Sequence, residues 1–191
     1  MEITQKKGAV KHTFIFGDDF LNFAYKDKSG SGDRDVPYGN FPKKSSEVNE
    51  FNEWLRNVGL LWIGVSVVLI GLALNNGEPL TGKGFWMMMG LGCVAWAHYT
   101  KVVYTVFETE KGGVFIIQNK DHDTILEEIK KRRREQLLKW YGDINPDSTL
   151  ENETNKYNWL CDQDVISAEE AEQKIAQLEW LHKKEQRSPT N

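Results

Sequence analysis

Two long stretches without a formal charge dominate this sequence of 191 residues. Residues 57–77 include 21 consecutive uncharged positions, and residues 84–100 include another 17. The cores of soluble proteins rarely keep such stretches free of charge, whereas helices that cross a bilayer require them. The average composition conceals this feature, because 27% of the residues are charged and the mean hydropathy is -0.54. We therefore expect a membrane protein rather than a wholly soluble one.

The two stretches predict a transmembrane helical hairpin over residues 54–103, with spans at 57–76 and 84–103. The second stretch is short for a bilayer, since its uncharged part extends over about 25 Å at about 1.5 Å per residue. The long side chain of Lys101 can reach the headgroup region, so we expect the second span to continue through Val103.

Positive charge is concentrated on the side of the hairpin that carries both chain ends. The turn expected at residues 75–83 contains a single basic residue, Lys83. The outer ends of the spans are flanked by Lys43, Lys44, Arg56, Lys101, Lys111 and Lys120. Cytoplasmic segments next to membrane helices carry such an excess of Lys and Arg. The sequence therefore predicts a multi-pass protein of the bacterial inner membrane with both termini in the cytoplasm.

Residues 10–50 favour β structure ahead of the first span. Aromatic and aliphatic side chains alternate in residues 12–16 and again in residues 20–25. A Gly-Asp turn signal separates these two runs, and the combination is typical of a β-hairpin.

The rest of this region is expected to be less regular. Residues 28–33 are expected to form a flexible loop, and a short edge strand is expected to start at Val36. After Pro42 the sequence predicts the entry of a helix that leads into the first span. Ser45 or Ser46 would cap that helix.

The β pattern resumes after the second span. Residues 102–107 and 114–117 are predicted as two strands joined by a glycine turn. A helix is expected over residues 125–141. We expect these elements, residues 102–141, to complete the domain that begins before the hairpin.

Strands before the spans, strands after them and a final helix indicate one β domain interrupted by a hairpin. Residues 14–25, 36–41 and 104–117, followed by 123–134, resemble bacterial pleckstrin-homology-like proteins whose domain is split by a transmembrane hairpin. The resemblance implies an α+β membrane protein with a small cytoplasmic antiparallel β domain closed by a helix. Fewer strands are predicted than the family's full barrel needs, so we expect a reduced sheet or one completed by another copy.

The tail at residues 150–185 is expected to contain two short helices. Ser167 and Glu170 match a capping box just before the second of them. Together with residues 157–160 and Leu178, this pattern resembles the SHOCT type of short carboxy-terminal module. That resemblance implies oligomerisation or protein contact rather than chemistry.

Small residues in both spans predict close packing of helices. Gly64 and Gly71 recur at helical spacing in the first span. Gly90, Cys93 and Ala97 do so in the second. Faces of small residues let helix backbones approach closely, here most simply within the hairpin.

The strongest charge signal is a run of five basic residues in the helix expected at 125–141. Such clusters near a membrane attract anionic lipid headgroups. A solvated helix face, partly neutralised by nearby glutamates, is the alternative interpretation. Five charges without a wider basic surface do not indicate nucleic acid as a partner. The candidate headgroup-binding residues are Lys130, Lys131, Arg132, Arg133 and Arg134.

The sequence contains no arrangement typical of catalysis. His98 is the one ionisable residue within a span, and we interpret it as an interfacial residue rather than a proton site. Asp121 and Asp123 flank His122 and are interpreted as helix caps rather than metal ligands. We therefore expect no enzyme activity, no cofactor and no metal.

Two classes of function are consistent with these features. The first is a non-enzymatic scaffold or regulator of the inner membrane that binds protein, or lipid, through its cytoplasmic domain. The second is an immunity or defence protein that protects against a membrane-targeting toxin. A channel is disfavoured, because the spans lack a polar stripe. The expected partners are the bilayer, a protein and a second copy, since the small-residue face, the tail and the incomplete sheet all favour a homo-oligomer.

Overall fold

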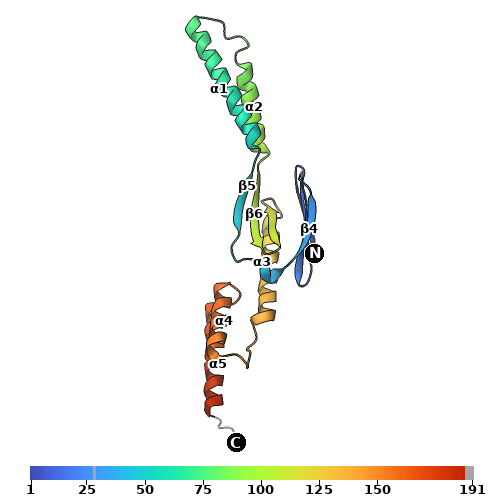
Figure 1. The fold of residues 1–191 in the computed structure, drawn as a ribbon, viewed down its shortest axis with the longest axis vertical. Coiled ribbons are helices and arrows are strands. Elements are labelled where there is room, and N and C mark those ends of the chain that lie inside the picture. The colour runs from blue at the N-terminus through green and yellow to red at the C-terminus, as the bar shows by residue number, and fades with distance from the viewer. Residues whose placement is uncertain (28, 188–191) are drawn as a thin grey trace.

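The computed structural model describes residues 1–27 and 29–187, which form an elongated α+β structure (Figure 1). Two antiparallel sheets and five α-helices make up this described part. Helices α1 and α2 extend from one end of the sheets, and α4 and α5 lie toward the other (Figure 1). The strands are β1 (Glu2–Lys7), β2 (Val10–Phe16), β3 (Phe20–Lys26), β4 (Ser31–Pro37), β5 (Ser46–Glu50), β6 (Val102–Thr109) and β7 (Gly112–Ile117). The helices are α1 (Glu53–Asn76), α2 (Phe85–Tyr99), α3 (His122–Tyr141), α4 (Leu150–Asp162) and α5 (Ala168–Arg187).

The first four strands form one sheet in the order β1-β2-β3-β4, and each pairs with the next in antiparallel fashion. Alternation along β2 and β3 directs Phe14, Phe16, Leu21 and Phe23 into the core. These residues confirm the hairpin that the sequence predicts.

Two parts of this sheet differ from the expectation. β1 lies outside the predicted strands, because its sequence is mostly polar and Gln5 is its one buried residue. β4 begins at Ser31, inside the loop expected at residues 28–33, and ends at Pro37 instead of starting near it. Pairing with β3 thus extends regular structure through polar residues. Residue 28 lies outside the described residues.

The second sheet has the order β5-β6-β7 and is also antiparallel. The helix entry predicted at Ser45 or Ser46 is wrong, because residues 46–50 form β5 and pair with β6. Every side chain of β5 is exposed, so no alternation of apolar residues marks this strand. Helix α1 begins instead after Asn52, whose side chain accepts a hydrogen bond from the Leu55 amide at 3.0 Å.

The described residues therefore form seven strands, four in one sheet and three in the other. The expected shortage of strands is wrong. The helix predicted at residues 125–141 is confirmed as α3, which begins slightly earlier, at His122. The main core cluster lies between the sheets and the first turns of α3 and consists of Phe14, Phe16, Leu21, Phe23, Val36, Tyr38, Phe41, Phe107, Val114, Ile116, Ile125 and Ile129.

A buried glutamine joins the two sheets. Gln5 of β1 is fully buried, and its Nε2 atom donates hydrogen bonds to the Ile117 carbonyl and to Asn119 Oδ1, both at 2.8 Å. The Ile117 amide donates to Gln5 Oε1, also at 2.8 Å. One side chain thus replaces the backbone ladder between the first strand and the last.

The two apolar helices differ in length. Among the described residues, α1 is the one helix long and apolar enough to cross a membrane. α2 has 15 residues, and the span predicted at 84–103 is too long, because Val102 already belongs to β6 and pairs with Glu50 of β5. The Ser66 hydroxyl donates to the Lys83 carbonyl at 2.9 Å, so α2 starts beside the middle of α1. A second complete crossing is therefore not supported by the length of α2.

The backbones of α1 and α2 touch at two glycines. A Cβ atom at Gly59 would lie 2.8 Å from the carbonyl oxygen of Gly90, and one at Gly90 would lie 2.6 Å from the carbonyl oxygen of Gly59. Nearby, the rings of Trp62 and Trp86 stack with centres 4.2 Å apart. This close approach explains why glycine is needed at both positions.

The small residues of the two spans do not contribute equally to this contact. Cys93 lies against α1, since its Cβ atom would be 3.1 Å from one placed at Gly59, and Ala97 is 2% exposed. Gly64 and Gly71 are outside the contact, because a Cβ atom at either would meet no other atom within 4 Å. Gly64 and Gly71 therefore take no part in the α1–α2 contact, and a packing role for them elsewhere stays a prediction.

The tail contains two helices, as predicted. Ser167 and Glu170 form the expected capping box before α5. The Ser167 amide donates to Glu170 Oε2 at 2.8 Å, and the Glu170 amide donates to Ser167 Oγ at 3.1 Å. Thr149 caps α4 through the Asn152 amide.

The substitution Gly59→Val is expected to separate α1 from α2, because its side chain would overlap the backbone of Gly90. Cys93, which lies beneath Gly59, should then react faster with a maleimide in detergent-solubilised protein carrying Cys161→Ser. Gly64→Val is the matched control, since its side chain points into open space. Equal labelling of the two variants would contradict the proposed contact.

Candidate functional site

A cleft of about 860 Å³ lies between the two sheets at the end nearest α1 and α2. The β1–β2 turn and strands β2 to β4 form one wall, and β5, β6 and β7 form the other. The base of the helical pair contributes Phe51 before α1 and both Trp96 and Thr100 at the end of α2. Segments far apart in the sequence thus enclose one space beside the apolar helices.

His12 of β2 is the buried polar residue of this cleft. Its ring is 4% exposed and lies 5.3 Å from the ring of Phe23 and 5.8 Å from that of Tyr104. Burial lowers the pKa of His12 and outweighs the opposite effect of the Phe115 backbone, so the imidazole is neutral near pH 7. Among the described residues, its Nδ1 atom is buried without a hydrogen-bond partner. Leaving a buried nitrogen without a hydrogen bond costs free energy unless a ligand or a water molecule supplies one.

Two cationic side chains lie along the cleft. Lys7 Nζ donates to the Lys101 carbonyl at 2.5 Å and so ties the β1–β2 turn to the end of α2. Arg34 Nη1 donates to the Lys111 carbonyl at 3.0 Å, and its guanidinium lies 5.3 Å from the centre of the Tyr25 ring. Each cation retains donors that these contacts do not use.

Two carboxylates lie along the same cleft. Asp27 accepts hydrogen bonds from the hydroxyl and amide of Ser29, which hold the pKa of Asp27 below its ordinary value. Glu50 is exposed and forms no ion pair within the described part of the chain. Burial raises the pKa of Tyr104, and the nearby Glu50 carboxylate adds to this effect. The cleft therefore presents separated charges of both signs around aromatic rings.

In the segment Asp121-His122-Asp123, the His122 ring makes its contacts within the fold. His122 Nε2 lies 2.8 Å from the Thr105 hydroxyl, and Nδ1 lies 2.7 Å from Asp123 Oδ1. Asp121 occupies the cap position of α3, but its side chain makes no capping hydrogen bond, so that part of the prediction is wrong. In the residues that the structure describes, no group of three His, Cys, Asp or Glu side chains could hold a metal.

Two arginines of the basic run join α3 to other parts of the chain. Arg133 is buried, and its Nε donates to the Phe41 carbonyl at 2.7 Å. Its Nη1 and Nη2 atoms donate to the carbonyl and to Oε1 of Gln163 at 3.1 and 2.5 Å. Arg134 Nε donates to the Val165 carbonyl at 2.7 Å. These hydrogen bonds connect α3 to Phe41, which follows the first sheet, and to the tail.

The other three basic residues differ in their surroundings. Arg132 pairs with Glu128 at 2.6 Å and also donates to the carbonyl of Gly17. Lys130 and Lys131 are exposed. Figure 1 places α3 on the side of the sheets away from α1 and α2. Headgroup binding by this run stays a prediction, and its free ammonium groups are those of Lys130 and Lys131.

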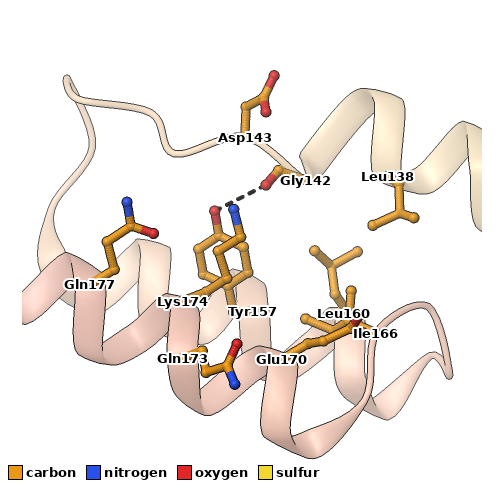
Figure 2. A pocket seen from close by; sticks show the side chains of 10 residues that line it. All are labelled: Leu138, Gly142, Asp143, Tyr157, Leu160, Ile166, Glu170, Gln173, Lys174 and Gln177. Atoms are coloured by element: carbon orange, nitrogen blue, oxygen red, sulfur yellow. Dashed lines mark hydrogen bonds between the residues drawn. The ribbon is translucent and has the colours of Figure 1, made fainter.

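A smaller hollow of about 400 Å³ lies between the end of α3 and the pair α4–α5 (Figure 2). Leu138, Leu160 and Ile166 form its apolar side. The Tyr157 hydroxyl donates to the Gly142 carbonyl at 3.2 Å, as the dashed line in Figure 2 marks. The side formed by α5 carries Glu170, Gln173, Lys174 and Gln177. The hollow thus has one apolar side and one polar side.

Three of the residues that organise these sites are absent from the candidates chosen by sequence. His12 shares the alternation of Phe14 and Phe16, so its inward direction could have been recognised. Gln5 and Gly59 carry no such signal, because their roles depend on contacts with Ile117 and Gly90.

No family model, curated protein or solved structure matches this chain. The functional argument therefore rests on the chain's own residues. His98, the ionisable residue of the second apolar stretch, is exposed near the end of α2.

Replacement of Arg133 by Met should loosen the tail, because it leaves the carbonyls of Phe41 and Gln163 without their donor. We expect faster hydrogen exchange in α4 and a loss of stability of about 2 kcal/mol. Lys131→Met, which removes an exposed charge two positions earlier, is the control. Unchanged exchange in α4 for Arg133→Met would show that this arginine does not hold the tail.

Proposed function

We propose that this protein is a non-enzymatic scaffold or regulator of the bacterial inner membrane. Helices α1 and α2 anchor it, and its cytoplasmic parts act by binding protein or lipid. The observation that carries this proposal is the apolar, exposed surface of α1, which extends away from the sheets (Figure 1). Leu61, Val68 and Leu74 are 64%, 60% and 65% exposed. Water would not tolerate so large an apolar surface, whereas a bilayer would cover it.

In this proposal α2 returns through the bilayer beside α1. Its residues carry no formal charge, and Met88 and Trp96 are 76% and 63% exposed. At about 1.5 Å per residue α2 extends about 22 Å, so the segment at residues 77–84 would complete the passage. The Glu78 and Lys83 side chains of that segment pair at 2.5 Å, which reduces the cost of holding them near the bilayer. Both termini would then lie in the cytoplasm.

The strand arrangement supports a relation to pleckstrin-homology-like domains split by a hairpin. Four strands face three, α3 contacts the core with Ile125 and Ile129, and the helical pair is inserted between β5 and β6. The resemblance of the tail to SHOCT modules is supported by two helices with a capping box. Under this proposal the sheets position the molecule at the membrane surface and the tail contacts other proteins.

We keep the homo-oligomer in the proposal, although fewer observations now support it. The strand count no longer supports it, since the described residues include both complete sheets. The small-residue face of α2 is covered by α1 at Gly59. Self-association would therefore act through the tail, whose hollow in Figure 2 offers an apolar side and a polar rim.

Membrane insertion predicts that the full chain stays in the membrane pellet after carbonate extraction. Val67→Arg should move it to the soluble fraction, because an arginine in mid-helix opposes insertion by about 2.5–3.5 kcal/mol. Val67 is 54% exposed, so the substitution leaves the α1–α2 contact intact. Ile15→Arg, at a 44% exposed position of β2, is the control and should stay in the pellet. Native protein in the supernatant would contradict the proposed anchor.

The proposed topology predicts which cysteines an impermeant maleimide reaches in intact cells. With Cys93→Ser in the background, a cysteine introduced by Asn75→Cys at the exposed far end of α1 should be labelled from outside. Cys161 in α4 should be labelled only after the inner membrane is permeabilised. Labelling of Cys161 in intact cells, or protection of the position-75 cysteine there, would overturn the two-crossing arrangement.

A further inference from the structure

The cleft between the sheets has the size and position of a lipid-headgroup site. Its volume of about 860 Å³ lies within the range of sites that bury small molecules. Phe51 and Trp96 line its edge at the base of the helical pair. An amphiphile whose polar end entered the cleft could therefore keep its apolar chains beside α1 and α2.

The innermost part of the cleft favours a primary ammonium group. His12 Nδ1 is buried and unpaired within the described residues, and the neutral ring offers a lone pair there. The rings of Phe23 and Tyr104 lie 5.3 and 5.8 Å from that of His12, and Phe115 lies 6.0 Å from Tyr104, between ring centres. Aromatic faces attract cations, and an acceptor between them adds a requirement for an N–H donor.

Charged side chains also line the cleft. Lys7, whose contact with the Lys101 carbonyl places it at the end of α2, retains donors that suit a phosphate. Asp27 and Glu50 lie along the same cleft and favour a ligand that also carries positive charge. A zwitterionic headgroup therefore matches the charges of both signs that line the cleft.

We propose that this cleft binds the headgroup of a primary-amine phospholipid of the phosphatidylethanolamine class. The ammonium group donates to His12 Nδ1, the phosphate lies by Lys7, and the acyl chains follow Phe51 and Trp96 toward the helical pair. The inference rests on the proposed function, because the mouth of the cleft must lie at a membrane surface.

The test is native mass spectrometry of the full chain in mild detergent, titrated with dioctanoyl phosphatidylethanolamine, phosphatidylcholine or phosphatidylglycerol. We expect phosphatidylethanolamine to bind about tenfold more tightly than phosphatidylcholine, whose trimethylammonium group cannot donate to His12. His12→Phe should abolish this preference while keeping an aromatic ring in place. His182→Phe, at an exposed position of α5, is the matched control and should retain it.

A second variant keeps the test valid if His12→Phe is unstable. Lys7→Gln should weaken binding of both phosphatidylethanolamine and phosphatidylcholine and leave the ratio between them unchanged. Equal binding of these two lipids by the native chain, tightest binding of phosphatidylglycerol, or full affinity in Lys7→Gln would each overturn the inference. Carbonate extraction of the same protein separates the two proposals. A chain that stays in the pellet but does not distinguish the lipids retains its anchor and loses this site.

Discussion

The pairing of β5 with β6 is the constraint on which the rest of the structure depends. Glu50 at the end of β5 lies opposite Val102 at the start of β6, although both apolar helices separate them in the sequence. Because adjacent strands lie about 5 Å apart, the helices must leave the sheet side by side. Large side chains at the first contact would force them apart, which is why glycines occupy positions 59 and 90. The cleft exists at the same place, where the sheets open beneath the helices.

The elements predicted correctly are those whose sequence pattern matches their burial. Phe14 and Phe23 alternate with exposed residues, and Ile129 recurs at helical spacing, so β2, β3 and α3 could be identified locally. β5 could not, because it buries none of its side chains and is defined by its partner. The sequence places Val102 both in the second span and in a strand, and the structure confirms the strand alone. Val102 is apolar and follows an apolar helix, yet its hydrogen bonds belong to the sheet.

The candidate site was harder to predict than the fold. The basic run from Lys130 to Arg134 has an obvious sequence signal, but charge alone cannot reveal that Arg133 is buried against Phe41. Its guanidinium acts inside the protein, where a buried charge needs several acceptors. The cleft has no contiguous signature at all. His12 reaches it through strand alternation, whereas Trp96 reaches it from a helix more than eighty residues later.

The side chain of Gln5 gives the chain a strict order of assembly. Its partner Ile117 is 112 residues further along, so the ribosome exposes the glutamine long before the strand that satisfies it. Contacts of such long sequence separation form late and slowly. During synthesis Gln5 of β1 has no partner until both apolar helices and then β6 and β7 have been made. The two sheets can therefore be joined through Gln5 only after every intervening segment has been made. A chain that stops within the helices leaves the edge of β1 unpaired.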